Sequence, residues 1–174
     1  MPKLRVETSD QALYELAERT GRVLKAAQWI ATTAESCTGG WVAKALTDVA
    51  GSSAWFERGY VTYSNDAKME NLGVAARVLK AHGAVSKETA QQMARGALRA
   101  SGAHVAVAIT GIAGPDGGTA EKPVGTVWFG LASRAGRSVQ FATQRKRFDG
   151  DREAVRRQSV EQALRMIVRA CGKR

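Results

Sequence analysis

The 174-residue sequence has little cysteine and histidine, with two residues of each type. Two cysteines, Cys37 and Cys171, cannot build the disulfide framework of a small secreted domain. Neither these cysteines nor His82 and His104 stand at a metal-ligand spacing, so we expect no metal site. Cys37 lies within a motif described below, but a free cysteine is more often a small buried residue than a nucleophile.

Long hydrophobic runs and low-complexity segments are also missing. No apolar stretch approaches the roughly 20 residues of a membrane span, and the first ten residues lack the apolar core of a signal peptide. The hydrophobic content of 44% is that of a folded protein, and the length is sufficient for one core. We therefore predict a single domain over residues 1–174, located in the cytoplasm and without membrane contact.

Acidic residues are outnumbered, 16 against 26 basic ones, which gives a net charge of +10. Much of the excess lies between Arg134 and Arg157, where Phe141 and Phe148 are the only aromatic residues, and in the C-terminal tail, which has none, so no extended platform for base stacking is indicated. A solvated basic face is therefore the favoured interpretation, and nucleic acid is an unlikely partner. A basic rim would also attract a small anionic ligand.

Helical and strand-like patterns alternate along the chain. Ser9 or Asp10 could cap a first helix, and Asn65 or Asp66 a short helix that ends near Leu72. Apolar runs predict strands, and 3.6-residue patterns predict helices between them. The expected strands are 30–35, 59–64, 105–109, 124–133 and 138–147, and the other expected helices are 40–48, 74–82, 86–101 and 151–171.

This order predicts an α/β fold of three layers, α/β/α, with a mixed, mostly parallel sheet. Strands joined through helices should be parallel, whereas the last two strands, joined by a short turn at 134–137, should be antiparallel. Ligands in such folds bind at the carboxyl ends of the strands.

Two small-residue loops follow predicted strands. The first, Ala34-Glu35-Ser36-Cys37-Thr38-Gly39-Gly40-Trp41, leads from a strand into a helix. A helix N-terminus carries unpaired N–H groups and the positive end of the helix dipole, so this turn is a potential anion site. The second loop, at residues 110–118, contains four glycines, and tight turns alone could explain them. Together the loops suggest a pocket for a phosphorylated small molecule.

Ser52, Ser53, Tyr63 and Lys68 could carry nucleophilic chemistry. No Ser-His-Asp set is visible, but a lysine of lowered pKa or a tyrosine beside a lysine can replace histidine as the base. Packing and solvation explain an isolated Tyr and Lys equally well. Neither loop matches a P-loop, a dinucleotide fingerprint or a hydrolase nucleophile elbow.

Four segments carry a resemblance to a known family. Residues 34–40 (AESCTGG), 59–68 (GYVTYSNDAK), 110–118 (TGIAGPDGG) and 122–127 (KPVGTV) together resemble the C-terminal domain of the competence-damage protein CinA. The resemblance runs from about Leu13 to Val168. It does not include the molybdopterin-binding-like half of full-length CinA, so we expect none of the functions tied to that half.

The resemblance implies hydrolysis of the carboxamide of nicotinamide mononucleotide to nicotinate mononucleotide and ammonia, in pyridine-nucleotide salvage and without a cofactor. The family's Ser-Tyr-Lys set falls on Ser53, Tyr63 and Lys68, with Ser53 as nucleophile and Ser52 and Ser36 as rivals. The implied substrate-binding residues are Ser36, Thr38, Gly39, Gly40, Thr110, Gly111 and Arg152.

The family also implies a homodimer, to which Trp55 and Phe56, if exposed, could contribute. The alternative function is a non-catalytic, DNA-associated competence protein that binds a nucleotide, for which the net charge of +10 is the motive.

Overall fold

The structure is a computed structural model and describes residues 8–172. One five-stranded sheet has the order β2-β1-β3-β4-β5. The strands are β1 (Ala31–Glu35), β2 (Phe56–Val61), β3 (Val105–Gly111), β4 (Thr126–Ala135) and β5 (Ser138–Arg147). β1 pairs in parallel with β2 and β3, whereas β4 is antiparallel to both β3 and β5. Four of the five strands therefore run in one direction, and the predicted mixed, mostly parallel sheet is confirmed.

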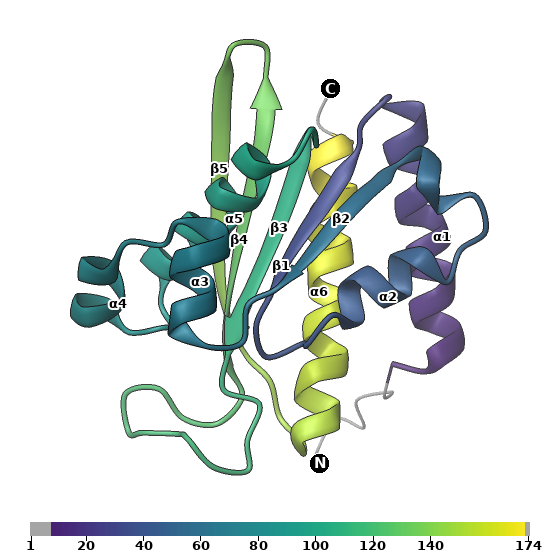
Figure 1. Cartoon of the computed structure of the whole chain (residues 1–174). Coiled ribbons are helices and arrows are strands. Elements are labelled where there is room, and N and C mark those ends of the chain that lie inside the picture. The colour runs from purple at the N-terminus through teal and green to yellow at the C-terminus, as the bar shows by residue number, and fades with distance from the viewer. Residues whose placement is uncertain (1–7, 173–174) are drawn as a thin grey trace.

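Helices cover both faces of the sheet (Figure 1). They are α1 (Asp10–Ala26), α2 (Trp41–Thr47), α3 (Asn65–Leu72), α4 (Ala76–His82), α5 (Lys87–Ala100) and α6 (Arg152–Cys171), with a short 3₁₀ turn, η1, at Ser52–Ala54. α1, α2 and α6 lie on one face, and α3, α4 and α5 on the other. This is the predicted three-layer α/β/α arrangement. None of the helices in the described part of the chain has the length and apolar character of a membrane-spanning segment.

Each face of the sheet has its own apolar core. Phe129, Leu24 and Ile167 belong to the cluster beneath α1, α2 and α6, whereas Met93 and Leu98 belong to the cluster beneath α3 and α5. The central strand β3 is buried on both faces along its first six residues, as its continuous apolar run predicted. The rigid sheet holds the loops at the carboxyl ends of β1, β2 and β3 in fixed positions.

Two predicted boundaries differ from the structure in ways that affect the site. β2 begins three residues earlier than predicted and ends at Val61, so Tyr63 lies beyond the strand. The cap of α3 is Ser64, whose hydroxyl accepts a hydrogen bond from the Ala67 amide at 3.1 Å. The start of β2 was predicted too late because β2 is an edge strand, and its exposed charged residues Glu57 and Arg58 weaken the apolar pattern of the strand. The helix from Ser86 also ends earlier, at Ala100.

Candidate active site

Ser36 and Lys68 meet at the carboxyl ends of β1 and β2. Ser36 directly follows β1, and Lys68 lies in the first turn of α3, which follows β2. The Lys68 Nζ lies 3.0 Å from the Ser36 Oγ. It also donates to the backbone carbonyls of Thr62, at 2.8 Å, and Tyr63, at 3.4 Å. A lysine nitrogen is thus held beside one serine hydroxyl by the backbone that leaves β2.

Lys68 is buried, with 1% of its surface exposed. Burial lowers the pKa of its ammonium below the ordinary value of 10.5, because the charged form loses its hydration. The part of the chain that the structure describes shows no ion pair to Lys68 that would restore the charged form. The site therefore favours a neutral amine more than a surface lysine does, which is the form that can accept a proton.

The side chain of Glu35, the last residue of β1, holds the turn that follows this strand. The Glu35 side chain is fully buried, and its carboxylate accepts hydrogen bonds from the Thr38 hydroxyl and from the amides of Gly40, Val42 and Ala43. The prediction that the α2 N-terminus is free to bind an anion is therefore wrong, because a side chain of the protein already occupies these donors. The Thr38 hydroxyl and the Gly40 amide are thus engaged within the turn.

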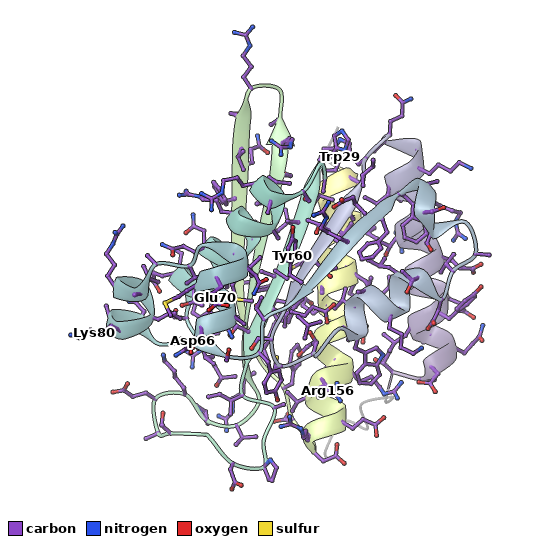
Figure 2. All side chains as sticks on the ribbon, viewed as in Figure 1. Trp29, Tyr60, Asp66, Glu70, Lys80 and Arg156 are labelled. Carbon is purple, nitrogen blue, oxygen red and sulfur yellow. The ribbon has the colours of Figure 1, made fainter. Side chains whose placement is uncertain are left out.

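Two arginines of α6 lie against these loops. Arg152 donates from its two terminal nitrogens to the carbonyl of Gly114, at 2.7 Å, and to the Tyr63 hydroxyl, at 2.9 Å. Arg156, on the amino-terminal half of α6 (Figure 2), donates to the carbonyls of Cys37 and Thr38, each at 3.1 Å. α6 thereby connects the turn after β1, the segment after β2 and the loop after β3.

Tyr63 and Arg152 form the outer part of this site. Tyr63 is 61% exposed, whereas Ser36 is only 9% exposed. Of the predicted catalytic set, the structure brings Tyr63 and Lys68 to one place, together with Ser36 and Arg152.

Ser53 is not part of this site. It lies in the exposed turn η1, just before β2, and the first residue of β2, Phe56, pairs with Ala31 at the amino end of β1. The six residues of β2 therefore separate it from the carboxyl-end loops by roughly 20 Å. The prediction that Ser53 joins Tyr63 and Lys68 is wrong. Ser53 precedes β2 and lies at its amino end, whereas Tyr63 and Lys68 follow β2 and lie at its carboxyl end. Ser52, in the same turn, also precedes β2.

Thr110 and Gly111 end β3 in the middle of the sheet, and both have internal roles. The Thr110 hydroxyl donates to the Ala84 carbonyl at 2.8 Å and ties β3 to the segment before α5. A Cβ at Gly111 would lie 2.8 Å from a methyl group of Val127, so the close approach of β4 requires glycine. Gly39, at a φ of +60°, permits the tight turn before α2.

Cys37, next to Ser36, is buried and is not a favourable nucleophile. Burial raises the pKa of its thiol to about 12, so the thiolate is scarce at neutral pH. The structure also corrects the interpretation of Trp55. This residue is 4% exposed, and its indole packs against Gly21 of α1, so it is not available to a dimer interface. Phe56 is partly buried and packs against the same core.

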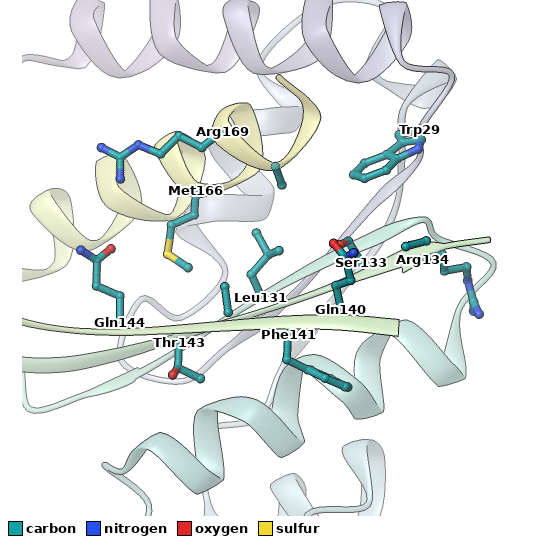
Figure 3. Close-up of a pocket in the computed structure, with 13 residues that line it drawn as sticks. Trp29, Leu131, Ser133, Arg134, Gln140, Phe141, Thr143, Gln144, Met166 and Arg169 are labelled. Carbon is teal, nitrogen blue, oxygen red and sulfur yellow. The ribbon is translucent and has the colours of Figure 1, made fainter. Parts of the chain in front are cut away.

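A large hollow of the described residues lies elsewhere. A cavity of about 570 Å³ is formed between the carboxyl half of α6, Trp29 and the strands β4 and β5, where Leu131 and Met166 line it (Figure 3). Leu131 pairs with Val107 in the first half of β3, so this cavity is remote from Ser36. A smaller hollow of about 440 Å³ adjoins the turn itself and is lined by Gly39, Gly40, Trp41, Lys44, Arg156 and Asp10. Within residues 8–172, no group of three or more His, Cys, Asp or Glu side chains could hold a metal ion.

Sequence reasoning missed Glu35 and Arg156. Arg156 follows Arg152 by one helical turn, so its place on the same face of α6 could have been inferred. Glu35 stood inside the quoted motif, but its role depends on a turn that brings the α2 N-terminus back over the preceding residue.

Comparisons with known proteins agree with this architecture. The family model of the CinA C-terminal domain matches residues 13–171. A nicotinamide-nucleotide amidohydrolase PncC from Enterobacter agglomerans is 56% identical over 165 residues, which cover 92% of this chain and 99% of the relative. The protein of the same name from Escherichia coli K12 is 57% identical over 159 residues, covering 91% and 94%.

Solved structures give the same result. The crystal structure of the competence/damage inducible protein CihA from Agrobacterium tumefaciens has a TM-score of 0.86 and 46% identity, and the match covers 98% of this chain and all of that one. A CinA superfamily protein from Klebsiella pneumoniae also has a TM-score of 0.86, with 45% identity and coverage of 91% and 97%. By sequence and by structure, the chain belongs to the CinA C-terminal domain family.

Proposed function

We propose that this protein hydrolyses the carboxamide of nicotinamide mononucleotide to nicotinate mononucleotide and ammonia, with Ser36 as the nucleophile and Lys68 as the base. Relatives that match nearly the whole chain at 56% and 57% identity are nicotinamide-nucleotide amidohydrolases. The single observation that carries the proposal within the molecule is the 3.0 Å contact between the Lys68 Nζ and the Ser36 Oγ.

In the structure the Lys68 Nζ donates to three oxygen atoms, as an ammonium does. The neutral amine, which burial favours, can keep the same three partners. Backbone carbonyls only accept hydrogen bonds, so the Thr62 and Tyr63 carbonyls take the two N–H groups that a neutral amine has. The lone pair then faces the Ser36 hydroxyl, which becomes the donor. A serine whose proton points at a buried amine is an activated nucleophile.

The reaction follows from this arrangement. The Ser36 Oγ attacks the carboxamide carbon while its proton moves to the Lys68 Nζ, and an oxyanion forms on the carboxamide oxygen. The C–N bond then breaks, and Lys68 returns the proton to the departing nitrogen, which leaves as ammonia. Water attacks the acyl group on Ser36 and gives one proton to Lys68, which returns it to the Ser36 oxygen as the C–O bond breaks. The product leaves as a carboxylic acid and loses its proton to the released ammonia in solution.

Arg152 is the proposed anchor for the nucleotide. Its guanidinium makes two forked hydrogen bonds at the mouth of the site, and such a fork matches a phosphate group. Substrate binding would replace the Tyr63 hydroxyl and the Gly114 carbonyl as its partners. The role of pyridine-nucleotide salvage, the cytoplasmic location and the homodimer stay predictions from the family resemblance.

The test is ammonia release from nicotinamide mononucleotide by the purified protein, with the product identified by mass spectrometry. Ser36→Ala should abolish turnover, and the matched variant Ser53→Ala should leave it unchanged, because Ser53 lies at the other edge of the sheet. Wild-type protein that releases no ammonia would refute the substrate. An active Ser36→Ala variant would refute the assignment of the nucleophile.

A further inference from the structure

Glu35 is a buried acidic residue that the proposed reaction does not use. Its side chain has no exposed surface, and the residue stands between the end of β1 and Ser36. We infer that Glu35 is a positioning residue, whose carboxylate holds the turn that presents the Ser36 hydroxyl to Lys68. This inference rests on the proposed role of Ser36.

The carboxylate is fully used as an acceptor. One oxygen accepts from the Thr38 hydroxyl at 2.6 Å, from the Gly40 amide at 3.1 Å and from the Val42 amide at 3.0 Å. The other oxygen accepts from the Ala43 amide at 2.9 Å. Three of these partners are backbone N–H groups, which can only donate, so the pattern is that of a carboxylate. Its charge also lies at the positive end of the α2 dipole.

The path of the chain explains why this anchor is local to Ser36. The Gly39 amide donates to the Ser36 carbonyl at 3.0 Å, and Gly39 and Gly40 both have left-handed backbone angles, with φ of +60° and +95°. These two glycines fold the chain back, so that α2 begins directly over the residue that precedes Ser36. The Glu35 carboxylate consequently lies at the centre of the turn, in the place where a bound anion would otherwise lie.

A second set of contacts holds the same turn from outside. Arg156 donates to the carbonyls of Cys37 and Thr38, each at 3.1 Å. Thr38 is thus fixed at two points, because its hydroxyl donates to Glu35 and its carbonyl accepts from Arg156. Ser36 itself is fixed to β3 through its amide, which donates to the Ile109 carbonyl at 2.9 Å. Loss of the Glu35 contacts removes the inner part of this support and leaves amides of the turn without their acceptor.

The expected effect is on the rate of the chemical step and not on substrate binding. Glu35 is enclosed on all sides and faces the turn, so it does not touch the substrate. A displacement of the nucleophile by about 1 Å can slow a reaction by about 100-fold. We therefore expect a lower kcat with a nearly constant KM when the carboxylate is altered.

The test compares three variants of the full chain with wild type. Glu35→Gln keeps the shape of the side chain but turns one acceptor into a donor. Thr38→Val removes only the hydroxyl that donates to Glu35. The matched control is Ser9→Ala, which removes the acceptor at another helix N-terminus, that of α1, where the Ser9 hydroxyl accepts from Ala12 at 3.1 Å. Kinetics on nicotinamide mononucleotide would be measured well below each melting temperature.

A second readout does not depend on the substrate. The labelling rate of Ser36 by a fluorophosphonate, followed by intact-protein mass spectrometry and peptide mapping, reports how the hydroxyl is presented. In Glu35→Gln we expect kcat and the labelling rate to fall together by about tenfold or more, with KM within about threefold of wild type. Thr38→Val should show the same change to a smaller extent, and Ser9→Ala should show none.

Several results would overturn the inference. A folded Glu35→Gln protein with wild-type kcat and labelling would do so, and so would an equal loss of kcat in Ser9→Ala. If Glu35→Gln does not fold, unaltered kcat and labelling in Thr38→Val decide against it. Wild-type protein that is labelled at Ser36 but does not hydrolyse nicotinamide mononucleotide would refute the proposed substrate alone, and the labelling rates of the variants would still test the role of Glu35.

Discussion

Replacement of Lys68 by methionine tests two consequences of burying a lysine beside a serine. The first is a base for the reaction, and the second is a stability that depends on pH. Methionine has a similar length and fills the same space without an amine. Because the Lys68 Nζ is the only group within reach of the Ser36 Oγ in the described hydrogen bonds, the variant loses both the base and the acid of the proposed reaction. General acid–base catalysis contributes about 10²- to 10⁴-fold, so kcat should fall by at least this factor.

The wild-type pH profile gives a second measure. Only the neutral amine accepts the Ser36 proton, so kcat/KM should rise tenfold per pH unit below the pKa of Lys68 and then level off. Burial lowers this pKa, so the plateau should begin at a lower pH than the ordinary lysine value of 10.5 would give. Initial rates of ammonia release between pH 5.5 and about 10 would show this limb.

Stability should depend on pH in the matching sense. The folded-state pKa of Lys68 is lowered, so between that pKa and 10.5 the unfolded chain binds the proton and the folded chain does not. The free energy of unfolding therefore rises with pH through this window, by about 1.4 kcal/mol for each unit by which the pKa is lowered. Below the window both states are protonated, and the folded state bears the full cost of the buried charge. Lys68→Met should lack this rise, which urea unfolding at several pH values would measure.

The control is Lys80→Met, on the exposed end of α4 (Figure 2). Its kcat and its unfolding profile should match wild type. A Lys68→Met protein with kcat within about threefold of wild type would refute the assignment of the base. A wild-type pH profile that still rises tenfold per pH unit at pH 10 would refute the claim that the pKa of the catalytic Lys68 is lowered.

Two further variants test the mouth of the site and the packing of α3. Arg152→Lys replaces a fork by a point charge, so KM for nicotinamide mononucleotide should rise by about tenfold or more with a smaller change in kcat, and the contact to Tyr63 should be lost; an unchanged KM would contradict the anchor role. Gly96→Ala should destabilise the protein by about 2–4 kcal/mol in urea unfolding, although the same change usually stabilises a helix, because its Cβ would lie 1.9 Å from the Leu72 carbonyl; a higher melting temperature would contradict the close contact of α3 and α5.

Much of the fold could be predicted because its pattern is local. β3 is a continuous apolar run, and its burial on both faces followed from that run. Ser9, one of the two predicted caps of the first helix, accepts a hydrogen bond from the Ala12 amide. β2 was predicted three residues too late because an edge strand keeps polar residues on its exposed side, so its pattern is weaker than that of a central strand.

The turn around Glu35 could not be predicted from the same kind of signal. Its bonds reach amides at positions 40, 42 and 43, and they form only because two consecutive glycines adopt left-handed angles. From composition alone, small residues before a helix indicate a site for a bound anion. Nothing in that pattern shows that the carboxylate of Glu35, five residues before Gly40, accepts these hydrogen bonds instead. The general principle that a helix N-terminus attracts negative charge held, but the charge is supplied by the chain itself.

The error over Ser53 has a different origin, because the predicted elements already contained the information to avoid it. Ser53 precedes the strand that Tyr63 and Lys68 follow. In neighbouring parallel strands, the residues before each strand lie together at the amino ends, and the residues after each strand lie together at the carboxyl ends. Ser36 follows β1, and β1 and β2 are parallel neighbours, so the residues after each strand must be close in space. Strand direction therefore selects Ser36 among the three serines, and the contact between Ser36 and Lys68 agrees with that selection. A functional Ser36→Ala variant would show that strand direction does not identify the nucleophile.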